Sequence, residues 1–141
     1  MYMDFGKYNN KLLDLIKEAM KDERHDRKKY GIMVETAPNK EIADQVRFAY
    51  EDEGKHYKMF QSIYEDLTGR RIEIPEPQVE KYDNYIDAVK SSINGELEAV
   101  EMYRDIRSML NSKKHRDMLF EIITDEQEHA TRFVYVFSMM K

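Results

Sequence analysis

Two Glu-x-x-His motifs stand 73 residues apart in this chain, and the histidine of each motif follows a further glutamate by 33 residues. The six residues are Glu23, Glu53, His56, Glu96, Glu126 and His129. The same offset of 73 relates three more pairs: Tyr30 to Tyr103, Asp52 to Asp125 and Phe60 to Phe133. So many coupled matches at one offset indicate an internal repeat rather than coincidence. The chain is therefore predicted to be one domain, residues 1–141, made of two related halves at about 1–68 and 74–141.

Composition favours an all-α fold. Gly (5) and Pro (3) are scarce among the 141 residues, and Glu, Lys, Leu, Met and Ala dominate the long segments, as expected of helices. Strand-like alternation is confined to residues 71–74. A chain of this length can bury about two thirds of its unfolded surface in a single core.

Several classes of function are excluded by residues that the chain lacks. The net charge of −5 is interspersed and leaves no basic stripe for nucleic acid. With no cysteine, the chain can form no disulfide, thiolate nucleophile, iron–sulfur cluster or Cys-rich zinc site. No apolar run approaches the roughly 18 residues of a membrane span, and residues 1–11 lack the apolar region of a signal peptide. A soluble cytoplasmic protein is expected.

Apolar residues at helical spacing predict four helices. The apolar residues that mark them run from about Tyr8 to Val34, from Val46 to about Leu67, from Ile86 to Leu110 and from Met118 to Phe137. Pro38 and Asn39 separate the first two, Thr68 and Gly69 close the second, and Ser112 lies between the last two. The one long connection, residues 70–79, is extended and contains two prolines; about 10 such residues reach roughly 35 Å. This crossover predicts a bundle of two helical hairpins joined by one long connection.

On such helices the six repeated residues can converge. A spacing of three residues puts the Glu and the His of each motif on nearly the same face. Four carboxylates in a helical interior would repel one another and lose hydration, at several kcal/mol for each uncompensated charge. Two divalent cations would neutralise them. Oxygen ligands with two imidazoles suit iron or manganese, including a mixed site, and zinc could bind without redox use.

The pattern resembles the ferritin-like diiron carboxylate proteins, and most closely the rubrerythrin branch, over nearly the whole chain. The resemblance implies that Glu53 and Glu126 bridge the two metals and that each metal also has a terminal glutamate and one histidine. The terminal glutamates would be Glu23 and Glu96, and the histidines His56 and His129.

Two departures from the rubrerythrin pattern bear on peroxidase chemistry. A further glutamate is expected three residues after the ligand on the third helix, where this chain has Ala99. The Cys-rich rubredoxin module of full-length rubrerythrins is also missing from this sequence. The repeat-related position on the first helix is Asp26, which either supplies an extra carboxylate or is an exposed aspartate.

Residues around the ligands follow from the same resemblance. In similar diiron proteins the aspartate before the Glu-x-x-His glutamate bonds the opposite histidine, which predicts pairs of Asp125 with His56 and of Asp52 with His129. The alternative interpretation is that Asp52 and Asp125 are charged residues on exposed helix surfaces. Tyr30 and Tyr103, seven residues beyond the terminal glutamates, would either hydrogen-bond a ligand or serve as ordinary core aromatics.

Outside the ligand set, His25 and His115 are predicted to be surface groups.

Three functions are compatible with these residues. The first is a diiron oxidoreductase that reduces hydrogen peroxide, as in protection from oxidative stress, with electrons from an external electron-transfer protein. The second is a ferroxidase or iron-binding protein that oxidises Fe(II) with oxygen. The third is a metal-binding helical scaffold without catalysis. Apolar faces left over from the helices favour a homodimer.

Overall fold

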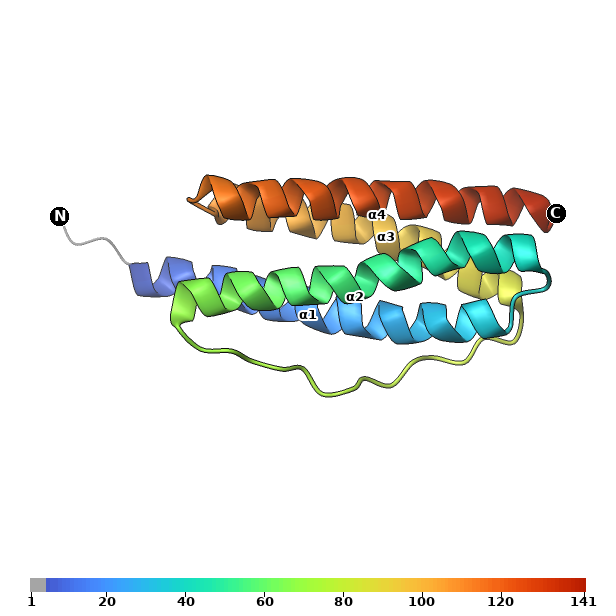
Figure 1. Cartoon of the computed structure of the whole chain (residues 1–141), viewed down its shortest axis with the longest axis horizontal. Coiled ribbons are helices and arrows are strands. Elements are labelled where there is room, and N and C mark those ends of the chain that lie inside the picture. The colour runs from blue at the N-terminus through green and yellow to red at the C-terminus, as the bar shows by residue number, and fades with distance from the viewer. Residues whose placement is uncertain (1–4) are drawn as a thin grey trace.

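The computed structural model describes residues 5–141, with side chains from residue 10 onward. It contains four helices: α1 (Phe5–Glu35), α2 (Lys40–Thr68), α3 (Tyr85–Met109) and α4 (Lys113–Met139). Figure 1 shows them side by side as one elongated bundle. Within the described residues there is no strand, so the predicted all-α class is confirmed. Residues 1–4, part of the predicted first repeat, lie outside the described residues.

The residues predicted to separate the helices do so by capping their ends. Asn39 caps α2 by accepting a hydrogen bond from the backbone N–H of Ile42 at 2.9 Å. Gly69 ends α2 in the left-handed conformation, with φ of 75°, which costs a glycine little. Ser112 caps α4 by accepting from the backbone N–H of His115 at 3.1 Å. The ends of the two hairpin turns at Asn39 and Ser112, and the start of the crossover at Gly69, are therefore sharply defined.

The predicted connection, residues 70–79, lies within a crossover that extends through residue 84. Helix α3 begins at Tyr85, one residue before the predicted start of the third helix. Figure 1 shows the crossover running along the length of the bundle, as the single long connection requires. The stretch that alternated like a strand is anchored to α2 instead of pairing: Gln61 donates to the carbonyl of Ile72, and the N–H of Ile74 donates to the hydroxyl of Tyr57.

The apolar core consists of two clusters, one towards each end of the bundle, and each cluster contains residues of both sequence repeats. One cluster includes Leu12, Ile16, Met20, Phe60, Ile63, Tyr103, Ile106 and Ile122. The other includes Tyr30, Met33, Ile42, Val46, Val89, Phe133 and Val136. The repeat is visible in their packing. The ring of Tyr30 packs on Phe133 and the ring of Tyr103 packs on Phe60, each with centroids 5.0 Å apart.

Two predictions about surface residues require correction. His115 is buried, with an exposed fraction of 7%, because its Nε2 bonds to Asp66 at 2.8 Å. His25 is half-buried rather than fully exposed, since both of its ring nitrogens bond to carboxylates. No helix in the described part of the chain is long and apolar enough to span a membrane. Some large apolar side chains, such as Phe120 and Val134, remain exposed, and the homodimer stays a prediction.

Candidate metal centre

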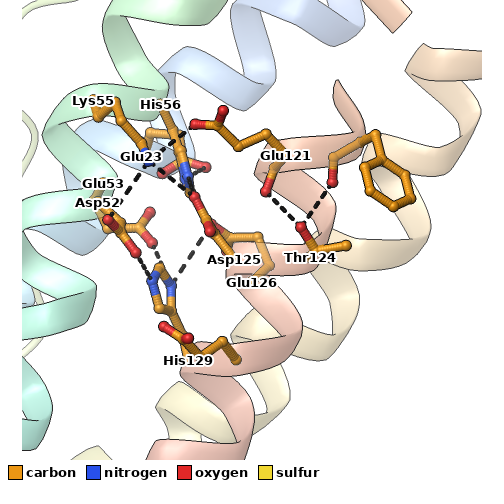
Figure 2. Close-up of polar contacts among 12 residues, drawn as sticks. Glu23, Asp52, Glu53, Lys55, His56, Glu121, Thr124, Asp125, Glu126 and His129 are labelled. Atoms are coloured by element: carbon orange, nitrogen blue, oxygen red, sulfur yellow. Dashed lines mark hydrogen bonds and ion pairs between the residues drawn. The ribbon is translucent and has the colours of Figure 1, made fainter. Parts of the chain in front are cut away.

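The six repeated residues meet in the interior of the bundle. Each helix contributes: Glu23 lies on α1, Glu53 and His56 on α2, Glu96 on α3, and Glu126 and His129 on α4. All six have exposed fractions of 0%. Figure 2 shows the α2 and α4 residues of this set and Glu23 converging from their helices. Burying four carboxylates and two imidazoles together is costly unless something compensates their charge.

The ligand atoms form two overlapping groups. One group comprises Glu23, Glu53, His56 and Glu126, and the other Glu53, Glu96, Glu126 and His129. In each group the four residues offer ligand atoms that lie within 4.8 Å of one another. Glu53 and Glu126 belong to both groups. This sharing is the arrangement that two metal ions with two common carboxylates require.

Most of these ligand atoms lack a hydrogen-bond partner. Nine buried side-chain nitrogen and oxygen atoms are without one in the described residues, and all but the Nε of Arg24 belong to the six residues. The Nδ1 of His56 lies 2.9 Å from a Glu126 oxygen, and the Nδ1 of His129 lies 3.2 Å from a Glu53 oxygen, yet neither contact is a hydrogen bond. Buried polar atoms are rarely left unpartnered in proteins. A pair of divalent cations fits these atoms.

Each histidine is held from behind by an aspartate of the opposite hairpin. His56 Nε2 lies 2.8 Å from Asp125, and His129 Nε2 lies 2.8 Å from Asp52. The structure thus brings together both predicted pairs. Since a carboxylate accepts, Nε2 carries the hydrogen and Nδ1 is left facing the centre. This backing fixes the tautomer and the ring orientation that a metal ligand needs. The two imidazole rings are roughly parallel, with centroids 6.0 Å apart.

Lys55 is a charged neighbour that the sequence did not single out. Its Nζ lies 3.2 Å from Asp125 and 3.0 Å from Glu121, so it spans from α2 to α4 outside the histidines (Figure 2). No repeat partner signals it, because the equivalent position on α4 is Glu128. Its effect is to hold Asp125 ionised, and the pKa of Asp125 is lowered by His56 and Lys55 despite partial burial.

The two tyrosines reach across the bundle to the terminal glutamates. Tyr30 on α1 donates to Glu96 on α3 at 2.6 Å, and Tyr103 on α3 donates to Glu23 on α1 at 2.7 Å. Of the two readings that the sequence allowed, both apply: each tyrosine is a core aromatic and also hydrogen-bonds a candidate ligand. Burial, together with the nearby carboxylates, raises the pKa of both hydroxyls well above the usual value, so they remain donors.

Without metal, protons balance the charge of the centre. Burial raises the pKa of Glu53 and Glu126 well above the ordinary value, and the neighbouring carboxylates raise it further. Burial would lower the pKa of His56, but the hydrogen bond with Asp125 and the closeness of Glu23 raise it to about 9. His129, likewise opposed by burial, reaches a pKa of about 10 through Asp52 and Glu96. The centre at neutral pH therefore holds protons where cations would bind.

Asp26 belongs to neither group of ligand atoms. Its Oδ1 instead bonds to the ring of His25 at 2.9 Å, and His25 bonds in turn to Glu80 of the crossover at 3.0 Å. Burial raises the pKa of Asp26 to about 6, although its bond to His25 opposes this and the charges of Glu96 and Glu23 add to it. Asp26 therefore lies near the centre, while a ligand role stays a prediction.

The chain is similar to known proteins over nearly its whole length. Residues 14–137 match the family described as Rubrerythrin. Uncharacterized protein YhjR of Bacillus subtilis (strain 168) is 27% identical over 106 residues, which cover 75% of this chain and 72% of YhjR.

Two solved structures share the fold. A ferritin-like, diiron-carboxylate protein from Bacillus anthracis str. Ames superposes with a TM-score of 0.82 at 17% identity, covering 96% of this chain and 99% of that chain. Desulfovibrio desulfuricans bacterioferritin, whose diiron site was studied in different catalytic states, superposes with a TM-score of 0.78 at 18% identity, covering 97% and 84%. The predicted ferritin-like bundle is confirmed.

Proposed function

We propose, on the premise that this chain belongs to the rubrerythrin family, that it binds two iron ions at the buried glutamates and histidines and reduces hydrogen peroxide. The family, with the fold of ferritin-like diiron-carboxylate proteins, supports a diiron oxidoreductase or iron-binding role. The observation that carries the proposal is the set of buried, unpartnered ligand atoms in two groups that share Glu53 and Glu126.

Each residue has a defined task in this proposal. Glu53 and Glu126 would bridge the two ions, Glu23 and Glu96 would each bind one ion, and so would His56 and His129. Oxygen-rich sites with imidazoles suit iron and also manganese. The aspartates behind the histidines, Asp52 and Asp125, orient the rings, and the tyrosine hydroxyls hold the terminal carboxylates in place.

Two ferrous ions, when bound, would supply one electron each to split the O–O bond of hydrogen peroxide. With two protons, the products are two waters, so the reaction balances. The apolar clusters on either side keep bulk water from the site, and the buried histidines leave only their Nδ1 atoms facing it. Because the oxidised centre must be reduced again, an external electron-transfer protein is the implied partner. Protection against oxidative stress would follow from this activity.

A ferroxidase that oxidises Fe(II) with oxygen is the second candidate. A specific observation favours it: Asp22 and Glu98 lie together on the α1 and α3 side of the centre without an ion pair to lysine or arginine in the described residues, and burial with the neighbouring carboxylates raises the pKa of Asp22 to about 7. Unpaired carboxylates near the centre would raise the local concentration of Fe(II). Such an enzyme would continue to oxidise Fe(II) beyond two equivalents.

Stopped-flow oxidation of the iron-loaded protein separates the candidates. The metal-free protein is loaded anaerobically with two equivalents of Fe(II) and mixed with hydrogen peroxide or with oxygen at equal concentration. We expect peroxide to oxidise the centre at least about tenfold faster, a difference of about 1.4 kcal/mol in activation free energy. Equal or faster oxidation by oxygen, with continued turnover on added Fe(II), would favour the ferroxidase. Binding of two divalent metal ions with no oxidation by either oxidant would leave only the metal-binding scaffold.

A further inference from the structure

A cavity of about 260 Å³ lies between α1 and α3, beside the candidate metal centre. It is lined by Asp22 and Asp26 on α1 and by Gly95, Glu98, Ala99 and Met102 on α3. Since a water molecule takes about 30 Å³ of the liquid, the cavity has room for several molecules the size of hydrogen peroxide. It is the kind of space through which a small reactant could move.

The cavity adjoins the terminal glutamates. Asp22 and Gly95 immediately precede Glu23 and Glu96 in the chain, and Ala99 follows Glu96 by one helical turn. Ala99 and Met102 also pack against the apolar cluster that includes Tyr103. None of the six candidate ligands lines the cavity; Ala99, one turn beyond Glu96 on the same face of α3, connects its wall to the helix segment that carries a candidate ligand.

The internal repeat shows which residues keep the space open. An offset of 73 takes Asp22 to Gly95 and Asp26 to Ala99, so α3 has the smallest side chains where α1 has aspartates. A Cβ atom added at Gly95 would meet nothing within 4 Å. A larger side chain at position 95 would thus project into free space rather than clash.

On α1, the repeat-related residues are covered by other parts of the chain, so no equivalent cavity forms there. Glu98 and Met102 correspond to His25 and Lys29. His25 is bonded to Glu80 of the crossover, and the buried Lys29 donates to Ser91 at 3.1 Å and lies 4.9 Å from the centre of the Tyr82 ring. The crossover and the start of α3 therefore cover that half of the α1–α3 surface, which leaves the cavity on the other half.

Two other surfaces of the bundle are closed by large side chains. Between α2 and α4, Lys55 bridges to Glu121 and Asp125, and further along Arg132 stacks 3.8 Å from the centre of the Phe48 ring. Between α1 and α2, Arg24 covers Tyr57, and Tyr57 is bound by the crossover. Helices α1 and α3 also approach each other less extensively than α3 and α4 do.

We propose that the oxidant reaches the metal centre through this cavity between α1 and α3, and that Gly95 and Ala99 determine how large an oxidant can pass. The inference rests on the proposed function, because it concerns the substrate of that same centre. The substrate class is a small neutral oxidant, hydrogen peroxide first among them. The acidic side chains of Asp26 and Glu98 at the cavity disfavour anionic oxidants.

Filling the cavity tests the proposal. Gly95→Leu is compared with Gly95→Ala and with Asn94→Leu, which places the same side chain at an exposed neighbouring position. In each variant, two equivalents of Co(II) first confirm that the metal site is intact. Oxidation of the ferrous protein is then followed with hydrogen peroxide and with the bulkier tert-butyl hydroperoxide. We expect Gly95→Leu to slow peroxide at least tenfold and tert-butyl hydroperoxide more, with both controls within twofold of the unmodified protein.

Reversible chemical blocking of the cavity distinguishes a blocked route from a folding defect, because the modified protein has already folded and bound iron. Because the chain has no cysteine, Gly95→Cys introduces a unique thiol, which methanethiosulfonate reagents of increasing size can modify after iron loading. The oxidation rate should fall as the attached group grows and recover when a reductant removes it, while Asn94→Cys should show no such change. Unchanged rates in both fully metallated position-95 variants would overturn the proposal. If oxygen rather than peroxide oxidises the unmodified centre, the peroxidase fails, yet the same variants still test the route with oxygen.

Discussion

Tyr30 on α1 donates a 2.6 Å hydrogen bond to Glu96 on α3, and the repeat-related tyrosine of α3 makes the equivalent bond back to Glu23 on α1. The aspartate–histidine pairs cross between hairpins in the same way. Each hairpin thus orients candidate ligands that belong to the other. Docking of the two hairpins and formation of the metal site should therefore be coupled.

Removing one tyrosine hydroxyl tests that coupling. Tyr30→Phe keeps the packing on Phe133 but leaves a buried carboxylate oxygen without its donor. Hydrogen bonds to charged groups contribute about 1.5–3 kcal/mol, so the unfolding free energy should fall by about that amount. Metal affinity should fall about 10–100-fold. Chemical denaturation and Co(II) titration measure the two effects, and Tyr103→Phe should match within a factor of three or so.

The tyrosine comparison has an internal control. Tyr135→Phe removes a hydroxyl that bonds to Glu41 on the exposed surface, far along the helices from the centre. That variant should keep its metal affinity. An equal loss of affinity in Tyr135→Phe would mean that the effect of Tyr30→Phe is not local.

The aspartates behind the histidines should matter for metal binding more than for folding. Asp125→Asn and Asp52→Asn weaken the orientation of His56 and His129, and a loss of about 10–100-fold in metal affinity is expected for each. Asp117→Asn, an exposed aspartate paired with Lys113 on the same helix, should leave the affinity unchanged. Competition with a chelator of known affinity measures all three. If Asp125→Asn and Asp52→Asn both kept their metal affinity, the two aspartates would not be needed to orient the histidines.

The fold was predictable because two independent signals agree. The 73-residue repeat predicts two related halves, and the spacing of the candidate ligands predicts that each half is a pair of helices. Asn39, Gly69 and Ser112 signalled the helix ends correctly because each acts locally, through a cap or a left-handed residue. Residues 80–84, between the predicted connection and the predicted third helix, were not assigned from the sequence. Residues 80–84 contain no helix breaker, and their structure depends on contacts with α1 and α3, such as Glu80 with His25.

The candidate site likewise contains some residues that the sequence predicted and some features that it did not. Residues tied by the 73-residue offset, including the crossed tyrosines, could be found from sequence because each occurs twice. Lys55 and the burial of His115 could not, since neither has a repeat partner of the same kind and both depend on one partner from another helix. The cavity likewise comes from a difference between the halves, at Gly95 and Ala99. Symmetry reveals shared functions, whereas asymmetric features need the three-dimensional structure.

Replacing a bridging carboxylate should affect the metal-free and metal-loaded protein differently. Glu126 has a pKa raised well above its usual value by burial and by the other carboxylates, which favours its protonated form without metal. Glu126→Gln imitates that form, and the metal-free protein should be as stable as before. The stabilisation by metal, about 2.7 kcal/mol at a hundredfold excess over the dissociation constant, should disappear.

Thermal unfolding with and without Zn(II) measures both quantities, together with metal content. Glu128→Gln, an exposed glutamate on the same helix, is the matched control and should keep the full metal-induced gain. Normal metal content in Glu126→Gln would contradict the site assignment. A large loss of stability in the metal-free variant alone would indicate a purely structural role.

Metal loading should release protons and should become more favourable as pH rises. Without metal, His56 and His129 have pKa values raised to about 9 and about 10, while those of Glu53 and Glu126 are also raised, by burial first. For the histidines, this stabilises the metal-free fold fully below the unfolded pKa near 6.5, and the contribution is lost as pH rises through 9 to 10. The raised pKa values of Glu53 and Glu126 act in the same direction, because ionisation of these side chains in the folded protein is unfavourable.

The metal-free melting temperature should therefore fall between pH 7 and 10, while the increase in melting temperature caused by Zn(II) should become larger. At pH 7, binding of two Zn(II) should release about two protons per chain from His56 and His129, and further protons from any protonated glutamate, measured with a pH indicator in weak buffer. Release of fewer than about two protons, or a metal-free fold that gains stability toward pH 10, would show that the centre is not balanced by protons in this way.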